Sequence, residues 1–424
     1  MLITDARLAD GRRVDVRVRD GSIAAVDADI APDADERTLD AAGRTLLPGV
    51  IDPHVHFREP GADHKETWTS GSRSAAAGGV TTVIDQPNTD PPTVDADAFD
   101  AKAERAQASL VDYGLAGGVT AEWEPDTLFD RPIAALGEVF LADSTGDMGI
   151  DEGLFRAALD RAAREDVLVT VHAEDATLFD EHARDRSDAD AWSAYRTPEA
   201  ESRAVERAVE LAADVGADLH VAHTSTPEAI DIVADSAATC EVSPHHCLLS
   251  RADLPDLGTH GRMNPPLRSE SRRQAVFERV RDGRVDLIAT DHAPHTRAEK
   301  DAGIWAAPSG VPGVETALPL LLGLVAEDEI ALERVVDLTA RRPADRFGLA
   351  AKGAIEVGRD ADLTLVDLDA TGEIRAADLH TACEWTPFGG WTGVRPEWTM
   401  VRGEVVYERE GDRFGDPVGE NAWA

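Results

Sequence analysis

The chain reads LLPGVIDPHVHFRE over residues 46–59, an apolar run followed directly by two histidines and an arginine. Side chains in a strand point alternately to opposite faces, so His54, His56 and Arg58 share one face. Two imidazoles two residues apart can bind one metal ion, and the guanidinium then lies just beyond them. The stretch therefore predicts a buried strand that ends in a metal site, beside a group that binds anions.

Further apolar runs follow, separated by amphipathic stretches, which is the pattern of repeated βα units and a parallel sheet. Together with the first run, the predicted strands are 46–56, 80–86, 114–119, 138–142, 167–172, 217–223, 239–244 and 285–291. Eight such units favour an α/β protein with a closed (β/α)8 barrel of the TIM type. The chemistry of such barrels lies at the C-terminal ends of the strands.

The two ends of the chain have a different pattern from the middle. Residues 14–23 and 398–407 alternate polar and apolar side chains between turn signals, which is typical of half-buried hairpins. We therefore expect two domains. They are a metal-dependent barrel over residues 51–348 and a small β domain formed jointly by residues 1–50 and 349–424.

The composition is strongly acidic, with 81 acidic against 42 basic residues and a formal net charge of −39 at pH 7. Such a surface repels itself in dilute buffer, but at molar salt the screening length falls to about 3 Å and the repulsion largely disappears. The composition predicts a halophilic protein in a salt-rich cytoplasm. It also argues against nucleic acid as a partner.

Cysteine use and hydropathy indicate the compartment. Cys240, Cys247 and Cys383 form no paired framework, so reduced, intracellular thiols are expected, with Cys247 a small buried side chain. No basic-then-apolar leader follows Met1, and no uncharged apolar run approaches the roughly 18 residues of a membrane span. We expect a cytoplasmic protein without a membrane partner.

Residues that can bind a metal stand at the ends of most predicted strands. They are His54 and His56, Asn88, Glu138 with Asp143, His172, His223, His245 with His246, and Asp291. A single buried histidine is most often a packed core residue, but packing alone does not place so many at strand ends. Their nitrogen and oxygen atoms suit zinc or a similar divalent ion.

The metal site favours hydrolysis of an amide-type bond. Two divalent ions about 3.5–4 Å apart lower the pKa of a shared water enough for it to attack a carbonyl at neutral pH. Asp291, at the end of the eighth predicted strand, is placed to bind one ion and to carry a proton from that water to a leaving nitrogen. We therefore expect Asp291 to be the catalytic general acid and base.

Several motifs resemble the dihydroorotase branch of the amidohydrolase superfamily. They are DPHVHFREPG at 52–61, KET at 65–67, AAAGGVTT at 75–82, PNT at 87–89, VHAED at 171–175, PHH at 244–246, NPPLR at 264–268, TDHAPH at 290–295 and GVETALP at 313–319. They follow the family's order through almost the whole chain. The resemblance implies the reversible cyclisation of N-carbamoyl-L-aspartate to (S)-dihydroorotate with loss of water, a step of pyrimidine biosynthesis.

The resemblance also assigns roles to residues. Two zinc ions per subunit are expected, although one is possible, the first held by His54, His56 and Asp291 and the second by His172 and His223. The residues that would position the substrate are Arg58, Asn88, Asn264 and His295. An arginine suits this task because its planar guanidinium can bind a carboxylate through two parallel hydrogen bonds.

The chain departs from the family at the ligand that bridges the two metals. Many relatives carry a carboxylated lysine in a segment resembling K-x-F-x-x-x-S-T-G, and here Glu138 stands in its place. A glutamate supplies the same charge but is shorter, and among apolar neighbours a carboxylate is costly to bury unless it is paired or metal-bound. We favour Glu138 as the bridge. Asp143 stays the alternative, since some dihydroorotases use an aspartate here, and a structural salt bridge is a third reading of Glu138.

Other functions fit part of the pattern. Hydantoinases, dihydropyrimidinases and allantoinases share the fold and the metals, so another cyclic amidohydrolase is the main alternative. An inactive subunit that only scaffolds a partner such as aspartate transcarbamoylase should have lost its metal ligands, which this chain keeps. A homodimer, or a complex of the active enzyme with aspartate transcarbamoylase, stays open. Residues 296–310 predict a loop at the mouth that closes over substrate.

Overall fold

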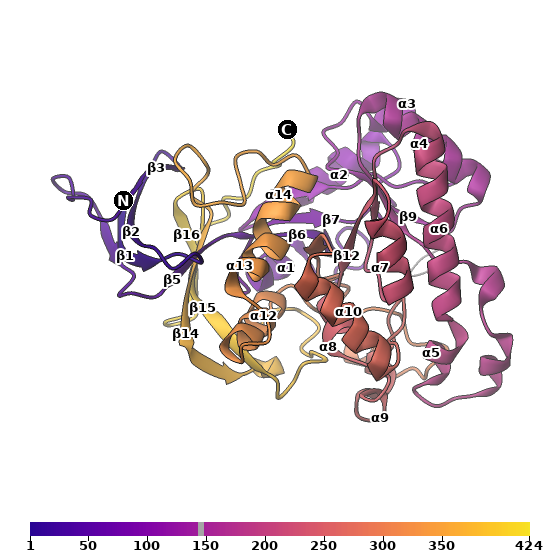
Figure 1. The fold of residues 1–424 in the computed structure, drawn as a ribbon. Coiled ribbons are helices and arrows are strands. Elements are labelled where there is room, and N and C mark those ends of the chain that lie inside the picture. Colours follow the sequence, from indigo (N-terminus) through magenta and orange to yellow (C-terminus); the bar gives the residue numbers. More distant parts are fainter. Residues whose placement is uncertain (143–147) are drawn as a thin grey trace.

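The computed structural model describes residues 1–142 and 148–424. A barrel of strands wrapped by helices forms the larger part of the molecule, and a sheet built from both ends of the chain packs beside it (Figure 1).

Eight parallel strands in the described part of the chain form the barrel, and each overlaps a predicted run. They are β6 (Val50–Val55), β7 (Val80–Asp85), β8 (Asp112–Leu115), β9 (Leu136–Phe140), β10 (Val169–His172), β11 (Leu219–Val221), β12 (Thr239–Val242) and β13 (Leu287–Ile288). Strands β8 and β9 begin two residues before the predicted runs at 114–119 and 138–142. The eight strands pair in the orders β6-β7-β8 and β9-β10-β11-β12-β13. Parallel bridges from Gly117 to Leu136 and from Val55 to His292 complete the ring. The predicted (β/α)8 fold class is confirmed.

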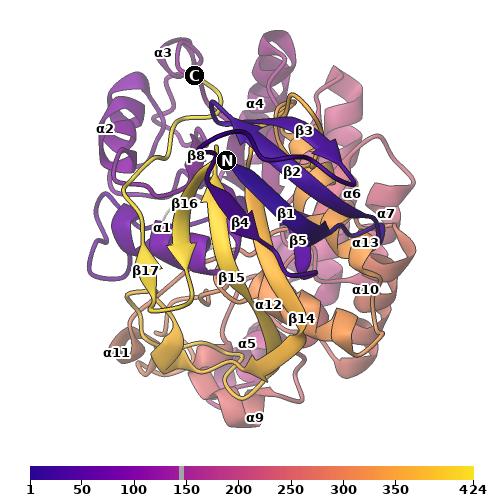
Figure 2. The same ribbon diagram turned by 90° about the vertical axis from the view of Figure 1, so that its left-hand side faces the viewer.

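The outer sheet is antiparallel for the most part and joins the two ends of the chain (Figure 2). Its strand order is β17-β16-β15-β14-β5-β1-β2-β3, with β4 paired to β1. The strands are β1 (Leu2–Arg7), β2 (Arg13–Arg19), β3 (Ser22–Asp27), β4 (Thr38–Asp40), β5 (Thr45–Pro48), β14 (Leu363–Glu373), β15 (Thr392–Val401), β16 (Glu404–Glu408) and β17 (Arg413–Phe414). A small β domain formed by the two ends of the chain is thus confirmed.

The run at 46–56, interpreted above as one strand, is two strands. β5 pairs with β14 in the outer sheet, and β6 opens the barrel one residue later. Gly49 separates them, at a place where a β-carbon would clash with the side chain of Thr81. Both strands are buried, so the apolar run continues across the change of sheet and its periodicity does not reveal the break.

Helices follow the strands and cover the outside of the barrel (Figure 1). The α-helices of the described part are α1 (Trp68–Ala77), α2 (Ala96–Ala106), α3 (Pro125–Leu128), α4 (Glu152–Glu165), α5 (Ala191–Tyr195), α6 (Pro198–Val215), α7 (Pro227–Ala234), α8 (Pro244–Leu248), α9 (Leu254–Leu257), α10 (Glu270–Asp282), α11 (Arg297–Lys300), α12 (Ala317–Ala326), α13 (Leu332–Val336) and α14 (Arg342–Arg346). Among these described helices, none is both long and apolar enough to cross a membrane.

Helix α6 shows how the sequence sets these elements. The Thr197 side chain accepts a hydrogen bond from the backbone N–H of Ala200, Pro198 occupies the first turn, and Gly216 ends the helix with a φ of 70°. Ala200, Ala204, Ala208 and Leu211 recur every three or four residues and are all buried. This spacing places one apolar face against the barrel.

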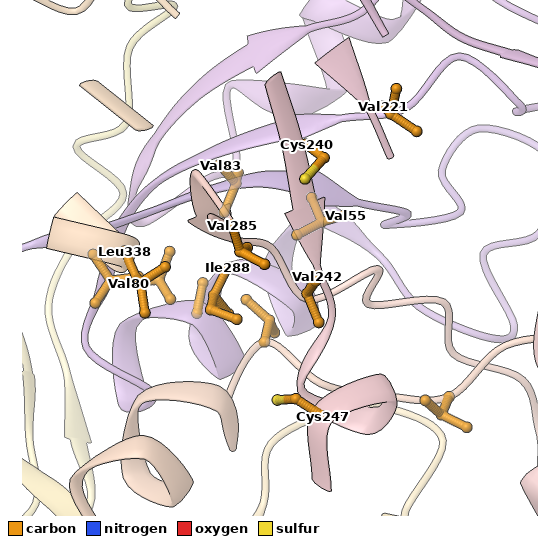
Figure 3. Packing of buried hydrophobic residues seen from close by; sticks show 14 of the residues in the cluster. Val55, Val80, Val83, Val221, Cys240, Val242, Cys247, Val285, Ile288 and Leu338 are labelled. Carbon is orange, nitrogen blue, oxygen red and sulfur yellow. The ribbon is translucent and has the colours of Figure 1, made fainter. Parts of the chain in front are cut away.

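Branched side chains form the core between the strands and the surrounding helices, among them Val55, Val83, Val242 and Ile288 (Figure 3). Cys240 and Cys247 belong to the same core, and all three cysteines of the chain are buried and free. The thiols therefore act as small core side chains, as the sequence predicts for Cys247.

A buried lysine ties the barrel to the outer sheet. This residue is Lys352. Its Nζ atom lies 2.7 Å from Oδ2 of Asp112 in β8 and 2.6 Å from Oδ2 of Asp362, just before β14. The lysine side chain is only 5% exposed. Because buried carboxylates need a cation beside them, this network fixes one part of the molecule against the other.

Candidate active site

The ten predicted metal and substrate residues gather at the C-terminal mouth of the barrel. A pocket there is lined by His56, Arg58, Asn88, Glu138, Phe140, His223, Asn264, Asp291, Ala293, Ser309 and Gly310. Three more of these residues are buried behind this wall. His54 and His172 contact Glu138, and His295 contacts Arg58. Ser309 and Gly310 come from the predicted mouth loop, so that loop forms one side of the pocket.

The first group of possible metal ligands is His54, His56 and Asp291, all buried and with their ligand atoms close together. Nε2 of His56 lies 3.0 Å from Oδ1 of Asp291, and Nε2 of His54 lies 3.7 Å from the same oxygen. This is the set that the sequence assigns to the first ion. The motif on β6 and the end of β13 meet here because the barrel closes between them.

The second group is His54, Glu138 and His223, so His54 belongs to both. Oε2 of Glu138 lies 3.4 Å from Nε2 of His54, and Oε1 of Glu138 lies 2.5 Å from Nε2 of His223. Nδ1 of His172 lies 3.1 Å from Oε1 of Glu138. The carboxylate of Glu138 thus contacts both His223 and His54, and His54 belongs to both groups. A ligand that bridges two ions must lie at such a place. The alternative bridge, Asp143, lies outside the described residues.

The hydrogen bonds around these histidines fit a cation between them. Nδ1 of His56 lies 2.7 Å from the carbonyl oxygen of Asn88, and Nε2 of His172 lies 2.9 Å from a carboxylate oxygen of Glu174. Each of these outer nitrogens must therefore donate, which leaves the inner nitrogen, next to a carboxylate oxygen, as the atom that can present a lone pair to a bound ion. Nε2 of His54 is buried without a hydrogen-bond partner in the described part of the chain. Lone pairs and carboxylates that converge in a buried site are the donor set of a divalent ion such as zinc.

The charges point the same way. Burial raises the pKa of Glu138, but the charges of His223 and His54 outweigh burial and hold that pKa well below its ordinary value. Burial also raises the pKa of Asp291, and the hydrogen bond to His56 with the charge of His54 again lowers it overall. Both carboxylates are therefore ionised, as metal ligands must be.

Two carboxylates that support the site had no role in the sequence analysis. Glu174 contacts His172 and forms an ion pair with Arg196. Glu241, in β12, contacts His54, with Oε1 of the glutamate 2.6 Å from Nδ1 of the imidazole. An unpaired carboxylate is costly to bury in a strand, so the glutamate inside the predicted strand 239–244 was a sequence signal that could have identified Glu241.

Arg58 is buried beside the metal groups and forms no ion pair with any described carboxylate. Its Nε atom donates to the backbone oxygen of Pro294 at 3.3 Å. Burial lowers the pKa of the guanidinium to about 10, which leaves the group charged at neutral pH. A buried cation without a carboxylate partner, on the wall of a pocket, is suited to bind an anionic ligand.

Asn88 and Asn264 both line the pocket but are held differently. The carbonyl oxygen of Asn88 accepts from His56, which gives Asn88 a second task beyond the predicted contact with substrate. Oδ1 of Asn264 accepts a 2.9 Å hydrogen bond from Nε1 of Trp192. Trp192 lies in α5, outside every motif that the sequence analysis used, and nothing in its local pattern indicated this contact.

Three of the site residues have left-handed backbone conformations. Their φ angles are 65° for Arg58, 33° for His223 and 45° for Asp291. Such conformations are uncommon for residues other than glycine and cost about 1–3 kcal/mol each. Their concentration at the pocket fits a functional site, where a side chain is kept in position although its backbone conformation is unfavourable.

A (β/α)8 barrel with converging histidines and carboxylates at its mouth defines a metal-dependent hydrolase of amide-type bonds. A profile of the Amidohydrolase family matches residues 45–406. The chain is 64% identical over 412 residues to a dihydroorotase of Halobacterium salinarum, with 96% of each chain covered. It is 42% identical over 414 residues to a dihydroorotase of Methanosarcina mazei, with 93% of this chain and 91% of the relative covered. The chain therefore belongs to the amidohydrolase family and, within it, to the dihydroorotases.

Solved structures with the same fold include proteins named hydantoinase and dihydropyrimidinase. The L-hydantoinase (dihydropyrimidinase) of Arthrobacter aurescens aligns with a TM-score of 0.94 at 29% identity, covering 99% of this chain and 98% of that one. The dihydropyrimidinase of Brevibacillus agri NCHU1002 aligns with a TM-score of 0.90 at 26% identity, covering 100% and 99%. The fold is thus common to several cyclic amidohydrolases, and side chains at the pocket must set the substrate.

Proposed function

We propose that this chain is a dihydroorotase, which closes N-carbamoyl-L-aspartate to (S)-dihydroorotate and water, and opens the ring in the reverse direction. The observation that carries the proposal is Arg58, a buried cation on the pocket wall without a described carboxylate partner. Dihydroorotate has a ring carboxylate that a guanidinium can bind, whereas an unsubstituted hydantoin has none. The 64% identical relative named dihydroorotase supports the same substrate.

The metal site completes the proposal. Two zinc ions would be held by His54, His56, Glu138, His172, His223 and Asp291, with Glu138 between them. A divalent ion there would polarise the reacting carbonyl and lower the pKa of water. Asp291 faces the pocket and its carboxylate is ionised, so it can accept a proton from water during ring opening. It then returns that proton to the leaving ring nitrogen, and in ring closure the two transfers run in reverse.

The remaining pocket residues would bind the substrate. Arg58 would bind the carboxylate, and Asn88 and Asn264 would contact polar atoms of the ring. His295 would help to position the substrate through its contact with Arg58. We also place this enzyme in a salt-rich cytoplasm. A homodimer and a complex with aspartate transcarbamoylase are the assemblies we propose to test by light scattering in molar salt.

The decisive experiment measures dihydroorotate hydrolysis and carbamoyl-aspartate cyclisation in molar potassium chloride, before and after chelation and with zinc restored. Hydantoin and allantoin serve as controls. Turnover of dihydroorotate alone, lost on chelation and recovered with zinc, is the expected result. Turnover of a control ring instead would make the chain a hydantoinase-like or allantoinase-like enzyme. Absence of all turnover in the zinc-loaded chain would favour an inactive subunit that only scaffolds a partner.

A further inference from the structure

Glu241 touches two of the candidate metal ligands at once and is almost completely buried, with 1% of its surface exposed. Its Oε1 atom lies 2.6 Å from Nδ1 of His54. The same oxygen lies 3.2 Å from the backbone nitrogen of His223. One oxygen of Glu241 therefore connects β6 to the end of β11, which are the two places that supply His54 and His223.

The contact with His54 fixes which ring nitrogen carries the proton. A carboxylate oxygen can only accept, so Nδ1 of His54 donates to it. Nε2 is then the nitrogen available to bind an ion, and it is the atom that lies 3.4 Å from Glu138 and 3.7 Å from Asp291. Without the carboxylate, the proton could move to Nε2 and block the lone pair on which metal binding depends.

The contact with His223 fixes a strained stretch of backbone. His223 has a φ of 33°, in the left-handed region that residues with a β-carbon rarely adopt. Its N–H group donates to Oε1 of Glu241, which stabilises this conformation. The conformation directs the imidazole to Glu138, with Nε2 of His223 2.5 Å from Oε1 of that residue.

Glu241 is itself held in place from its other side. Its Oε2 atom lies 3.1 Å from Nε2 of His220, and Nδ1 of His220 lies 2.7 Å from Oγ1 of Thr239. His220 belongs to neither group of possible metal ligands in the described part of the chain. The chain from Thr239 through His220 therefore presents Glu241 in one orientation.

We propose that Glu241 is the positioning residue of the metal centre, setting the His54 tautomer and the His223 backbone so that both present nitrogen lone pairs to a divalent ion. This inference rests on the metal site of the proposed function, but it concerns ion affinity and not the substrate. A purely structural role predicts lower stability of the metal-free chain with unchanged ion affinity. A positioning role predicts weaker ion binding in a chain that is folded.

The test measures the zinc dissociation constant by competition with a chromophoric chelator, and thermal unfolding of the metal-free chain, both in molar salt. Glu241→Gln keeps an oxygen for His54 and His223 but removes the charge, and Glu241→Ala removes both. We expect about a 10-fold weaker zinc affinity for the first and about 100-fold for the second. Zinc affinity equal to that of the parent in a folded Glu241→Gln would overturn the proposal.

Glu201 supplies the matched control. It is also a buried glutamate, and it accepts from the backbone nitrogens of Ser225 and Thr226, just beyond His223, without contacting a candidate ligand among the described residues. Glu201→Gln should destabilise the chain while leaving zinc affinity unchanged. An equal loss of zinc affinity in Glu201→Gln would mean that any buried glutamate here matters, and would also overturn the proposal.

A measurement on the parent removes any dependence on the folding of variants. In the zinc-loaded chain, NMR of nitrogen-labelled histidines should show Nδ1 of His54 protonated and Nε2 bound to the ion. The opposite tautomer would contradict the role of Glu241. Neither readout involves turnover, so a zinc-binding chain that does not hydrolyse dihydroorotate would refute the proposed function and leave this inference standing.

Discussion

Nη2 of Arg58 lies 3.2 Å from Nε2 of His295, yet the imidazole is not an acceptor for it. Nδ1 of His295 lies 3.1 Å from Nζ of Lys65, which can only donate, so the ring proton is on Nε2 and is donated to the backbone oxygen of Ser309 at 2.9 Å. Burial, with the charges of Arg58 and Lys65, holds the pKa of His295 well below its ordinary value, so the ring is neutral. The guanidinium therefore keeps donors for an anion in the pocket.

Substitution of Arg58 should weaken substrate binding. Arg58→Lys keeps the charge but loses the planar pair of donors, so KM for dihydroorotate should rise about 10-fold to 100-fold. Zinc content should not change. Steady-state kinetics in molar salt, with metal analysis of the same sample, provide the check. A KM equal to that of the parent would remove Arg58 from carboxylate binding.

Asp291→Ala should remove the group that carries the proton. We expect kcat to fall by at least about 100-fold, since a positioned acid or base contributes about that much or more. The fold should persist, because the residue lies at a strand end on the pocket wall. Circular dichroism and turnover measured together test this. Near-normal activity in a folded variant would exclude Asp291 from proton transfer.

Glu138→Gln tests the bridging ligand. The variant keeps the shape of the side chain but loses the charge that faces His54 and His223, so zinc per subunit should fall below that of the parent. Metal analysis after dialysis against a weak chelator measures the loss. Unchanged zinc content would return the bridging role to Asp143.

Lys352→Met should destabilise the whole chain. The variant leaves the buried carboxylate of Asp362 without its cation and takes one of two cations from Asp112, which keeps Arg402, and this costs about 3–5 kcal/mol. Urea unfolding in molar salt measures it. Arg203→Met is the control, because Arg203 pairs with Glu206 on the surface of α6, with 62% of its side chain exposed, and such a pair contributes about 0–1 kcal/mol. Equal effects of the two substitutions would contradict the proposed link between barrel and outer sheet.

Stability should depend on pH through His380, which is remote from the metal groups. Burial lowers the pKa of His380, but hydrogen bonds to Glu315 at 2.8 Å and to Asp412 at 2.9 Å outweigh burial and raise that pKa. A histidine whose pKa is raised by folding adds stability that is fully present below the unfolded pKa of about 6.5. The added stability is lost as pH rises through the folded value.

The difference in melting temperature between the parent and His380→Gln should therefore be largest in mildly acidic buffer and should shrink as the pH rises. Thermal scans across that range in molar salt measure it. His182→Gln, at an exposed position, should show no such trend. A difference that grows with pH would reverse the sign and refute the assignment.

Much of the barrel and the candidate ligands at its mouth could be predicted from the sequence, because their signals are local. Alternation of apolar runs with amphipathic stretches predicts βα units, and the spacing of His54 and His56 places both on one face of a strand. The acidic composition and the family motifs are likewise recognised from the sequence alone. The division of residues 46–56 between two sheets escaped this reasoning, since both strands are buried and give the same apolar pattern.

Contacts between distant parts of the chain were decided only by the tertiary structure. His54 and Glu241 are 187 residues apart, and their side chains meet only because the barrel closes and brings β6 near β12. The same closure placed the two oxygens of Glu138 between the metal groups and His295 behind Arg58. Periodicity specifies the face on which a side chain lies, but the stagger of the strands and the paths of the loops determine which distant atoms meet across the mouth of the barrel.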